Sequence, residues 1–243
     1  MSILLKVFLG FAIIASFQVS ARLDISQSNK VIFESISSED DHPIIVGPAG
    51  EIFDFIRTGK TTCGAFLLAK AIIPPGAGPL PHVHHYTNEW FYTPEKGIAI
   101  YMGESQYKET KLAPDIIGRD DVHIKIMQND ELIYGPKYYI HGFFNTTEKD
   151  LILYFVWTPD TKETSILDYF IASGIQIGNV NEQYNISQVN AIKFVTLAPK
   201  YGINQSHDFW QYVKDVHFTT DKMDDNKAGL IELLQSMQKC NTF

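Results

Sequence analysis

Residues 74–92 read PPGAGPLPHVHHYTNEWFY, a histidine-rich stretch with the alternation of a β-strand. Successive side chains of a strand point to opposite faces, so His82 and His84 are expected to share one face while His85 faces the other way. Glu89 follows after a short polar segment that a tight turn can span before a second strand returns. Two neutral imidazoles and a carboxylate then converge, a donor set suited to Fe, Mn, Ni, Cu or Zn.

A fourth donor, His141, lies in a later strand-rich run, residues 130–145, which reads DELIYGPKYYIHGFFN. The two stretches together resemble the two sequence motifs of the cupin family. The first motif is matched by Gly76, His82, His84 and Glu89 at the expected spacing, and the second by Pro136, His141 and Asn145. The resemblance implies an all-β cupin jelly-roll barrel and one divalent transition metal bound by His82, His84, Glu89 and His141.

The chain departs from the cupin pattern at three positions. Gly97 follows Glu89 after seven residues instead of six, and Asp130 and Tyr138 stand where the second motif has glycine. Tyrosine tolerates a positive φ far less well than glycine, so the turn before His141 needs another explanation. All four expected ligands are nevertheless present.

Composition and the N-terminus indicate a secreted globular protein. The 243 residues, 45% of them hydrophobic, are enough to bury a core. Residues 1–21 have the charged start, apolar run and small-residue end of a signal peptide, with an uncleaved anchor as the alternative. Its removal takes away one lysine, so the formal charge falls from −8 to −9. Such an acidic protein is a poor partner for nucleic acid or for an anionic membrane.

Extracellular chemistry raises two further expectations. Cys63 and Cys240 are the only cysteines, and an oxidising compartment leaves their pairing open. The sequons that start at Asn185 and Asn204 lie outside both motifs and are the predicted glycosylation sites. The sequon at Asn145 is not expected to carry a glycan, because the matching residue of cupins belongs to the barrel.

Short apolar runs punctuated by glycine and proline predict a β-sandwich or barrel over residues 22–160. Strands are expected at 31–33, 44–46, 52–56, 65–73, 98–102, 122–127 and 151–157, with a turn at 58–60. Residues 103–121 form a polar excursion that is either a lid or a plain surface loop. No second HxH pattern occurs, so a single cupin domain is predicted.

Residues 161–243 are expected to form a mainly helical extension packed on the barrel. Apolar residues recur at helical spacing in 165–171 and 224–240, and residues 208–213 predict a further short helix. The tract at 197–203 resembles the tail of single-domain, quercetinase-like cupins.

Strand parity predicts which side chains share the cavity with the metal. Phe91 should point inward with Glu89, and Tyr139, Phe143 and Asn145 should point inward with His141, which makes all four candidate substrate-binding residues. Glu89 is the candidate catalytic residue, as ligand, base or both.

Three functions are consistent with this sequence. The resemblance favours a metal-dependent dioxygenase that acts on an aromatic, flavonol-like small molecule, with dioxygen as co-substrate. The alternatives are a non-catalytic secreted binding or structural cupin, and a metal-dependent isomerase or lyase. The oligomeric state is left open, with a homodimer among the arrangements.

Overall fold

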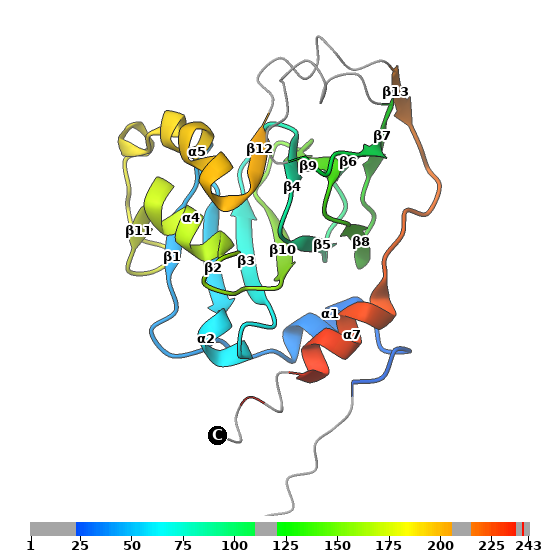
Figure 1. Cartoon of the computed structure of the whole chain (residues 1–243), viewed down its shortest axis with the longest axis horizontal. Helices are drawn as coiled ribbons and strands as arrows, with labels where there is room; N and C mark the ends of the chain where they lie inside the picture. Colours follow the sequence, from blue (N-terminus) through cyan, green and yellow to red (C-terminus); the bar gives the residue numbers. More distant parts are fainter. Residues whose placement is uncertain (1–22, 110–120, 206–214, 237–239, 241–243) are drawn as a thin grey trace, which may run out of the picture.

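The computed structural model describes residues 23–109, 121–205, 215–236 and 240, and its strands form two sheets (Figure 1). In spatial order the first sheet contains β11 (Ile175–Ile177), β1 (Ile44–Val46), β2 (Ile52–Arg57), β3 (Leu67–Ile73), β10 (Leu151–Thr158), β5 (Asn88–Thr93) and β8 (Glu131–Gly135). The second contains β12 (Ile203–Gln205), β4 (His82–His84), β9 (Tyr139–Asn145), β6 (Ile98–Gln106), β7 (Asp121–Ile126) and β13 (Asp215–Phe218).

Neighbouring strands run antiparallel, except that β13 pairs in parallel with β7. The inner faces of the two sheets enclose an aromatic and aliphatic core to which β2, β3, β5, β6, β9 and β10 all contribute. This arrangement of two facing, mainly antiparallel sheets confirms the predicted all-β jelly-roll barrel.

Two helices cover the outer face of the first sheet. They are α1 (Asn29–Glu34) and α7 (Lys227–Ser236), which lie side by side in Figure 1 although they come from opposite ends of the chain. Leu230, Ile231 and Leu234 of α7 are buried against Trp90 and Val156, which point outward from β5 and β10. Each such side chain stabilises the packing by about 1.5–3 kcal/mol. Both faces of β5 are therefore covered, with Glu89 and Phe91 buried on the inner face and Trp90 and Tyr92 on the outer face.

Two further helices pack against the core between the sheets. They are α4 (Ile166–Ser173) and α5 (Ala191–Leu197), with the 3-10 turns η1 (Ile186–Gln188) and η2 (Ala198–Tyr201) beside them. Ser165 begins α4 by accepting the main-chain N–H of Asp168, as an N-cap residue does. Tyr169 and Phe170 of α4 and Phe194 of α5 belong to the same core as the inner faces of the sheets.

The prediction of a helical extension outside the barrel therefore needs correction. The helices of residues 161–243 are present, but the same segment also supplies β11, β12 and β13, which pair with β1, β4 and β7. Edge strands of three or four residues are too short to show a period in the sequence, so only tertiary pairing reveals them.

Smaller expectations are also corrected. Residues 31–33 belong to helix α1 rather than to a strand, because Ser28 caps the helix and only one face is buried. Residues 59–62 form the short helix α2 where a turn was expected, and β6 continues four residues beyond Met102, to Gln106. The signal peptide at 1–21, the helix at 208–213 and most of the excursion at 103–121 lie outside the described residues.

A disulfide joins Cys63 to Cys240 and ties the end of the chain to the segment after α2. In the part of the chain that the structure describes, no helix is both long and apolar enough to cross a membrane.

Candidate metal centre

Three strands bring four potential metal ligands together. His82 and His84 come from β4, and His141 comes from the adjacent strand β9, where it is the register partner of His82. Glu89 comes from β5 of the opposite sheet. One ligand atom from each residue lies within 4.8 Å of the others, and all four side chains are buried. The structure thus assembles the four residues that both motifs predicted.

The atoms that face one another are the outer ring nitrogens and one carboxylate oxygen. Glu89 Oε2 lies 3.1 Å from Nε2 of His141 and 3.6 Å from Nε2 of His84. The three imidazole centroids lie 4.9–5.0 Å apart. These distances leave room for one ion between the donors, since metal–nitrogen and metal–oxygen bonds are about 2.0–2.2 Å long.

Hydrogen bonds hold each imidazole by its other nitrogen. Nδ1 of His82 donates to the carbonyl of Leu80 at 2.8 Å, and Nδ1 of His141 donates to the carbonyl of Tyr139 at 3.0 Å. Nδ1 of His84 lies 2.9 Å from the hydroxyl of Thr87. Because a carbonyl can only accept, His82 and His141 carry their proton on Nδ1 and present the lone pair of Nε2. Such outer partners fix both the tautomer and the orientation of metal-binding histidines.

The electrostatics of the group suit a cation. Burial lowers the pKa of His82 and His141 to about 4 and also lowers that of His84, so the imidazoles are neutral at physiological pH. Burial raises the pKa of Glu89 to about 8. Glu89 Oε2 and His141 Nε2 are buried without any hydrogen-bond partner, a costly state that a bound cation would relieve. The residues therefore fit one divalent transition metal.

The two glycine positions that the second motif lacks keep the glycine conformation. Asp130 and Tyr138 have φ of 58° and 76°, in the left-handed region that favours glycine. Tyr138 is held there because its main-chain N–H donates to the carbonyl of His84 at 2.8 Å. Lys137 Nζ also lies 5.0 Å from the centroid of the Tyr138 ring. The turn before His141 therefore forms even though Tyr138, and not glycine, occupies this position.

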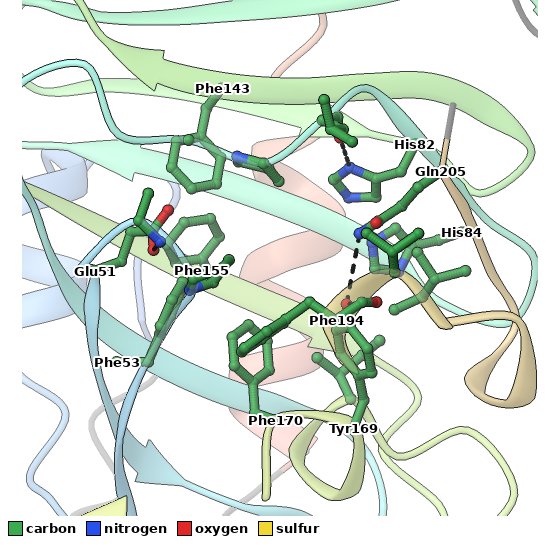
Figure 2. Close-up of a pocket in the computed structure, with 18 of the residues that line it drawn as sticks. Glu51, Phe53, His82, His84, Phe143, Phe155, Tyr169, Phe170, Phe194 and Gln205 are labelled. Carbon is green, nitrogen blue, oxygen red and sulfur yellow. Dashed lines mark hydrogen bonds between the residues drawn. The ribbon is translucent and has the colours of Figure 1, made fainter. Parts of the chain in front are cut away.

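A cavity of about 240 Å³ opens beside the ligand group (Figure 2). His82, His84 and Glu89 line it, and the remaining wall is mainly apolar with many aromatic side chains. The aromatic lining residues are Phe53, Phe143, Phe155, Trp157, Tyr169, Phe170 and Phe194. Neither lysine nor arginine is among the described residues that line this cavity. The site therefore joins a metal-binding group to an apolar chamber without a fixed positive side chain.

The predicted substrate-binding residues are placed differently from one another. Phe143 lines the cavity, whereas Phe91 lies behind it, 6.0 Å from the ring of His141 and in the core. Tyr139 accepts a hydrogen bond from Gln106, which is exposed, and lines a separate hollow. The pairing of β6 with β9 shifts register between Met102 and Gln106, so simple parity fails for Tyr139.

Asn145 is not brought to the cavity either. Its Nδ2 donates to the carbonyls of Ile73 and Lys149, and its Oδ1 accepts from Thr147. All of its polar atoms thus serve the barrel, so a substrate contact for Asn145 is corrected to a structural role.

His85 lies outside the ligand group, as parity predicts. It is buried, and its Nε2 lies 2.6 Å from Nδ2 of Asn204, while its main-chain N–H donates to the carbonyl of Gly202. The predicted glycosylation site Asn204 is thus half-buried with its amide nitrogen engaged. Asn185 is exposed and caps η1 by accepting from Ser187.

Several cavity residues were missed by sequence reasoning. They are Glu51, Phe53, Phe155, Trp157, Tyr169, Phe170, Phe194 and Gln205. Strand parity within each run could have found some of them, since Glu51 and Phe53 share a face. The residues of α4, α5 and β12 had no such signal, because nothing local shows which helix face meets the barrel.

The protein-family comparison matches a model described as glucose-6-phosphate isomerase (GPI) over residues 80–188. This range contains all four ligand residues but covers less than half of the chain. The two-sheet barrel and its three-histidine, one-glutamate group settle the architecture. The fold is that of a cupin. No curated protein matches this chain.

Among solved structures, an RmlC-like cupin from Shewanella frigidimarina NCIMB 400 is 14% identical, with a TM-score of 0.36 and coverage of 52% of this chain and 92% of the other. KdgF from Halomonas sp. is 13% identical, with a TM-score of 0.35 and coverage of 48% and 84%. A recombinant oxalate oxidase in complex with glycolate is 12% identical, with a TM-score of 0.33 and coverage of 40% and 43%. This chain thus spans less than half of that oxidase.

Proposed function

We propose that this protein is a metal-dependent cupin dioxygenase whose substrate is an aromatic small molecule with adjacent oxygen atoms. The observation that carries the proposal is the junction of the buried ligand group with an aromatic cavity that holds no cationic side chain. Adjacent oxygens suit a metal with open positions, and an aromatic body suits the walls.

The residues of the site have separable roles in this reaction. His82, His84 and His141 would hold the metal, which supplies a Lewis acid and access to redox chemistry when bound. Glu89 Oε2 lies beside two of the imidazoles and would act as a fourth ligand, as the base for a substrate hydroxyl proton, or as both. The aromatic wall excludes water and strengthens each polar contact inside.

The charge of the cavity argues against an anionic substrate. A phosphate or carboxylate group in a buried site needs a cation or several donors to offset its lost hydration. The described cavity lining offers two carboxyl groups, Glu51 and Glu89, and no lysine or arginine. A neutral ring is therefore preferred to a dicarboxylate or a sugar phosphate.

An isomerase is the second candidate, because the glucose-6-phosphate isomerase model matches the segment that contains all four ligands. The metal would then serve as a Lewis acid and Glu89 as the base that moves a proton between neighbouring carbons. The absence of a cation from the described lining disfavours a phosphorylated substrate in this cavity.

Metal content and oxygen uptake test the proposal together. The purified protein is loaded separately with Fe, Mn, Ni, Cu or Zn, and its metal content is measured. Flavonols, catechols and glucose 6-phosphate are then supplied under air and under argon. Oxygen consumption with an aromatic substrate supports the dioxygenase, and turnover under argon supports the isomerase. Loss of turnover with retained metal in Glu89→Gln assigns Glu89 as base.

We also propose that the chain is exported and that Asn185 carries a glycan. The apolar N-terminal stretch, the disulfide between Cys63 and Cys240 and the exposure of Asn185 support this. Intact-mass measurement of protein from a eukaryotic secretion host, before and after deglycosylation, tests both statements.

A further inference from the structure

The cavity contains a second buried carboxyl group, that of Glu51. This residue follows the turn of residues 47–50 and directly precedes β2. Only 2% of its surface is exposed. Figure 2 shows it across the cavity from His82 and His84, beside the rings of Phe53 and Phe155.

The surroundings of Glu51 do not neutralise its charge. Its Oε2 accepts the main-chain N–H of Ala49 at 2.9 Å, and no ion pair to it occurs among the described residues. Burial raises the pKa of Glu51 above its ordinary value. A carboxyl group in an apolar wall costs free energy unless a partner pairs with it. The hydrogen bond from Ala49 gives the carboxyl group a role in the turn, but it supplies no positive charge to pair with it.

The turn before Glu51 is shaped around the carboxyl group. A Cβ atom on Gly47 would lie 2.7 Å from Glu51 Oε2 and 3.0 Å from the ring of Phe53. The N–H of Gly47 also donates to the carbonyl of Glu51 at 2.7 Å. Glycine at position 47 therefore leaves space for the carboxyl group at the cavity wall.

We propose that Glu51 is a specificity-determining residue that binds a hydroxyl or amine group at the end of the substrate far from the metal. The substrate class is then a neutral or cationic aromatic molecule, with adjacent oxygens at one end and a hydrogen-bond donor at the other. This inference rests on the proposed function, because the metal group defines the first end. Carboxylates and phosphates at the second end are repelled by Glu51.

Two matched probes test this role. In 4-(hydroxymethyl)catechol and 4-ethylcatechol a hydroxyl replaces a methyl group of similar size. Binding of each to zinc-loaded protein is measured by calorimetry, since zinc does not oxidise catechols. The wild-type protein should bind the hydroxymethyl probe about tenfold more tightly, as a hydrogen bond to a charged group predicts.

Two variants change the carboxyl group in different ways. Glu51→Leu removes it, and Gly47→Ala displaces it; both should reduce the preference below about threefold while zinc content stays the same. Glu95→Gln is the matched control, because Glu95 is an exposed carboxylate paired with Lys149, and it should keep the full preference. If Glu51→Leu does not fold, the ratio of the two probe affinities in Gly47→Ala decides whether Glu51 has this role.

The outcomes separate this inference from the proposed function. An unchanged ratio in both folded variants, or no preference in the wild type, overturns the role of Glu51. Failure of the wild type to take up any metal counts against the proposed function instead. The same probe ratio, measured on metal-free protein, then still decides whether Glu51 recognises the donor group.

Discussion

Replacement of His141 by alanine should weaken metal binding far more than replacement of His85. His141 is wholly buried and supplies one of the four ligand atoms, with its Nδ1 already held by Tyr139. Loss of an outer partner alone costs about 10–100-fold in metal affinity, so loss of a ligand should cost at least about tenfold. His85 is similarly buried but bonds to Asn204 outside the group, which makes it a matched control.

The effect converts into a measurable melting shift. At a free metal concentration of one hundred times Kd, binding stabilises the fold by about 2.7 kcal/mol, which raises Tm by about 5–11 °C for a chain of this size. A tenfold weaker site at the same metal concentration retains about 1.4 kcal/mol. His141→Ala should therefore lose about half of the metal-induced shift or more.

The assay compares Tm with and without metal for the wild type, His141→Ala and His85→Ala, together with metal content after dialysis. Both variants are expected to lower the metal-free Tm, because both remove a buried side chain. Only His141→Ala should also shrink the metal-induced rise. Equal rises in the two variants would refute the assignment of the ligand group.

The other predictions concern the C-terminal segment, the second carboxyl group and glycosylation. Truncation after Thr158 removes β12, the partner of the strand that carries His82 and His84, so the product should aggregate and lose metal binding; a soluble monomer that retains the metal contradicts this. Because burial raises the native pKa of Glu51 above 4.5, its stabilising contribution is full below pH 4.5 and is lost as pH rises through the native pKa. The Tm of Glu51→Gln should therefore rise relative to that of the wild type as the pH increases from 4 to 8. A Tm difference that stays constant with pH, measured by fluorimetry, would contradict the burial of an ionisable carboxyl group at position 51. Asn185→Gln should reduce the intact mass of the secreted protein by one glycan, whereas Asn204→Gln should not, because the Asn204 amide is bonded to His85; the reverse pattern excludes this assignment.

The metal ligands were predictable because their spacing depends on local rules. Parity along one strand places His82 and His84 on one face. The expected return of Glu89 on a neighbouring strand was wrong, because β5 belongs to the opposite sheet and Glu89 meets the imidazoles across the core. His141 needed the second motif, since nothing local to residues 74–92 shows which later strand pairs with β4. The left-handed conformation of Tyr138 could not be foreseen from its residue type, because a long-range bond to His84 holds it.

Alternation and turn residues predicted the main strands of the barrel, but they did not predict β11, β12 and β13 or the placement of Tyr139. The helical period of apolar residues in 224–240 predicted one of the two outer helices. Residues 31–33 were predicted to form a strand, because three apolar residues fit the period of a strand and of a helix equally well. Tertiary packing decided that they form α1, whose buried residues belong to the same hydrophobic cluster as those of α7.

Only the tertiary structure decided what surrounds the metal group. The partner of Cys63, the placement of Tyr139 outside the cavity and the wall built from α4, α5 and β12 all depend on contacts between residues far apart in the chain. Glu51 lies opposite His82 because two sheets close over a common core. Sequence periodicity specifies which face of an element is apolar, but the free energy of burying that face depends on the partner that covers it.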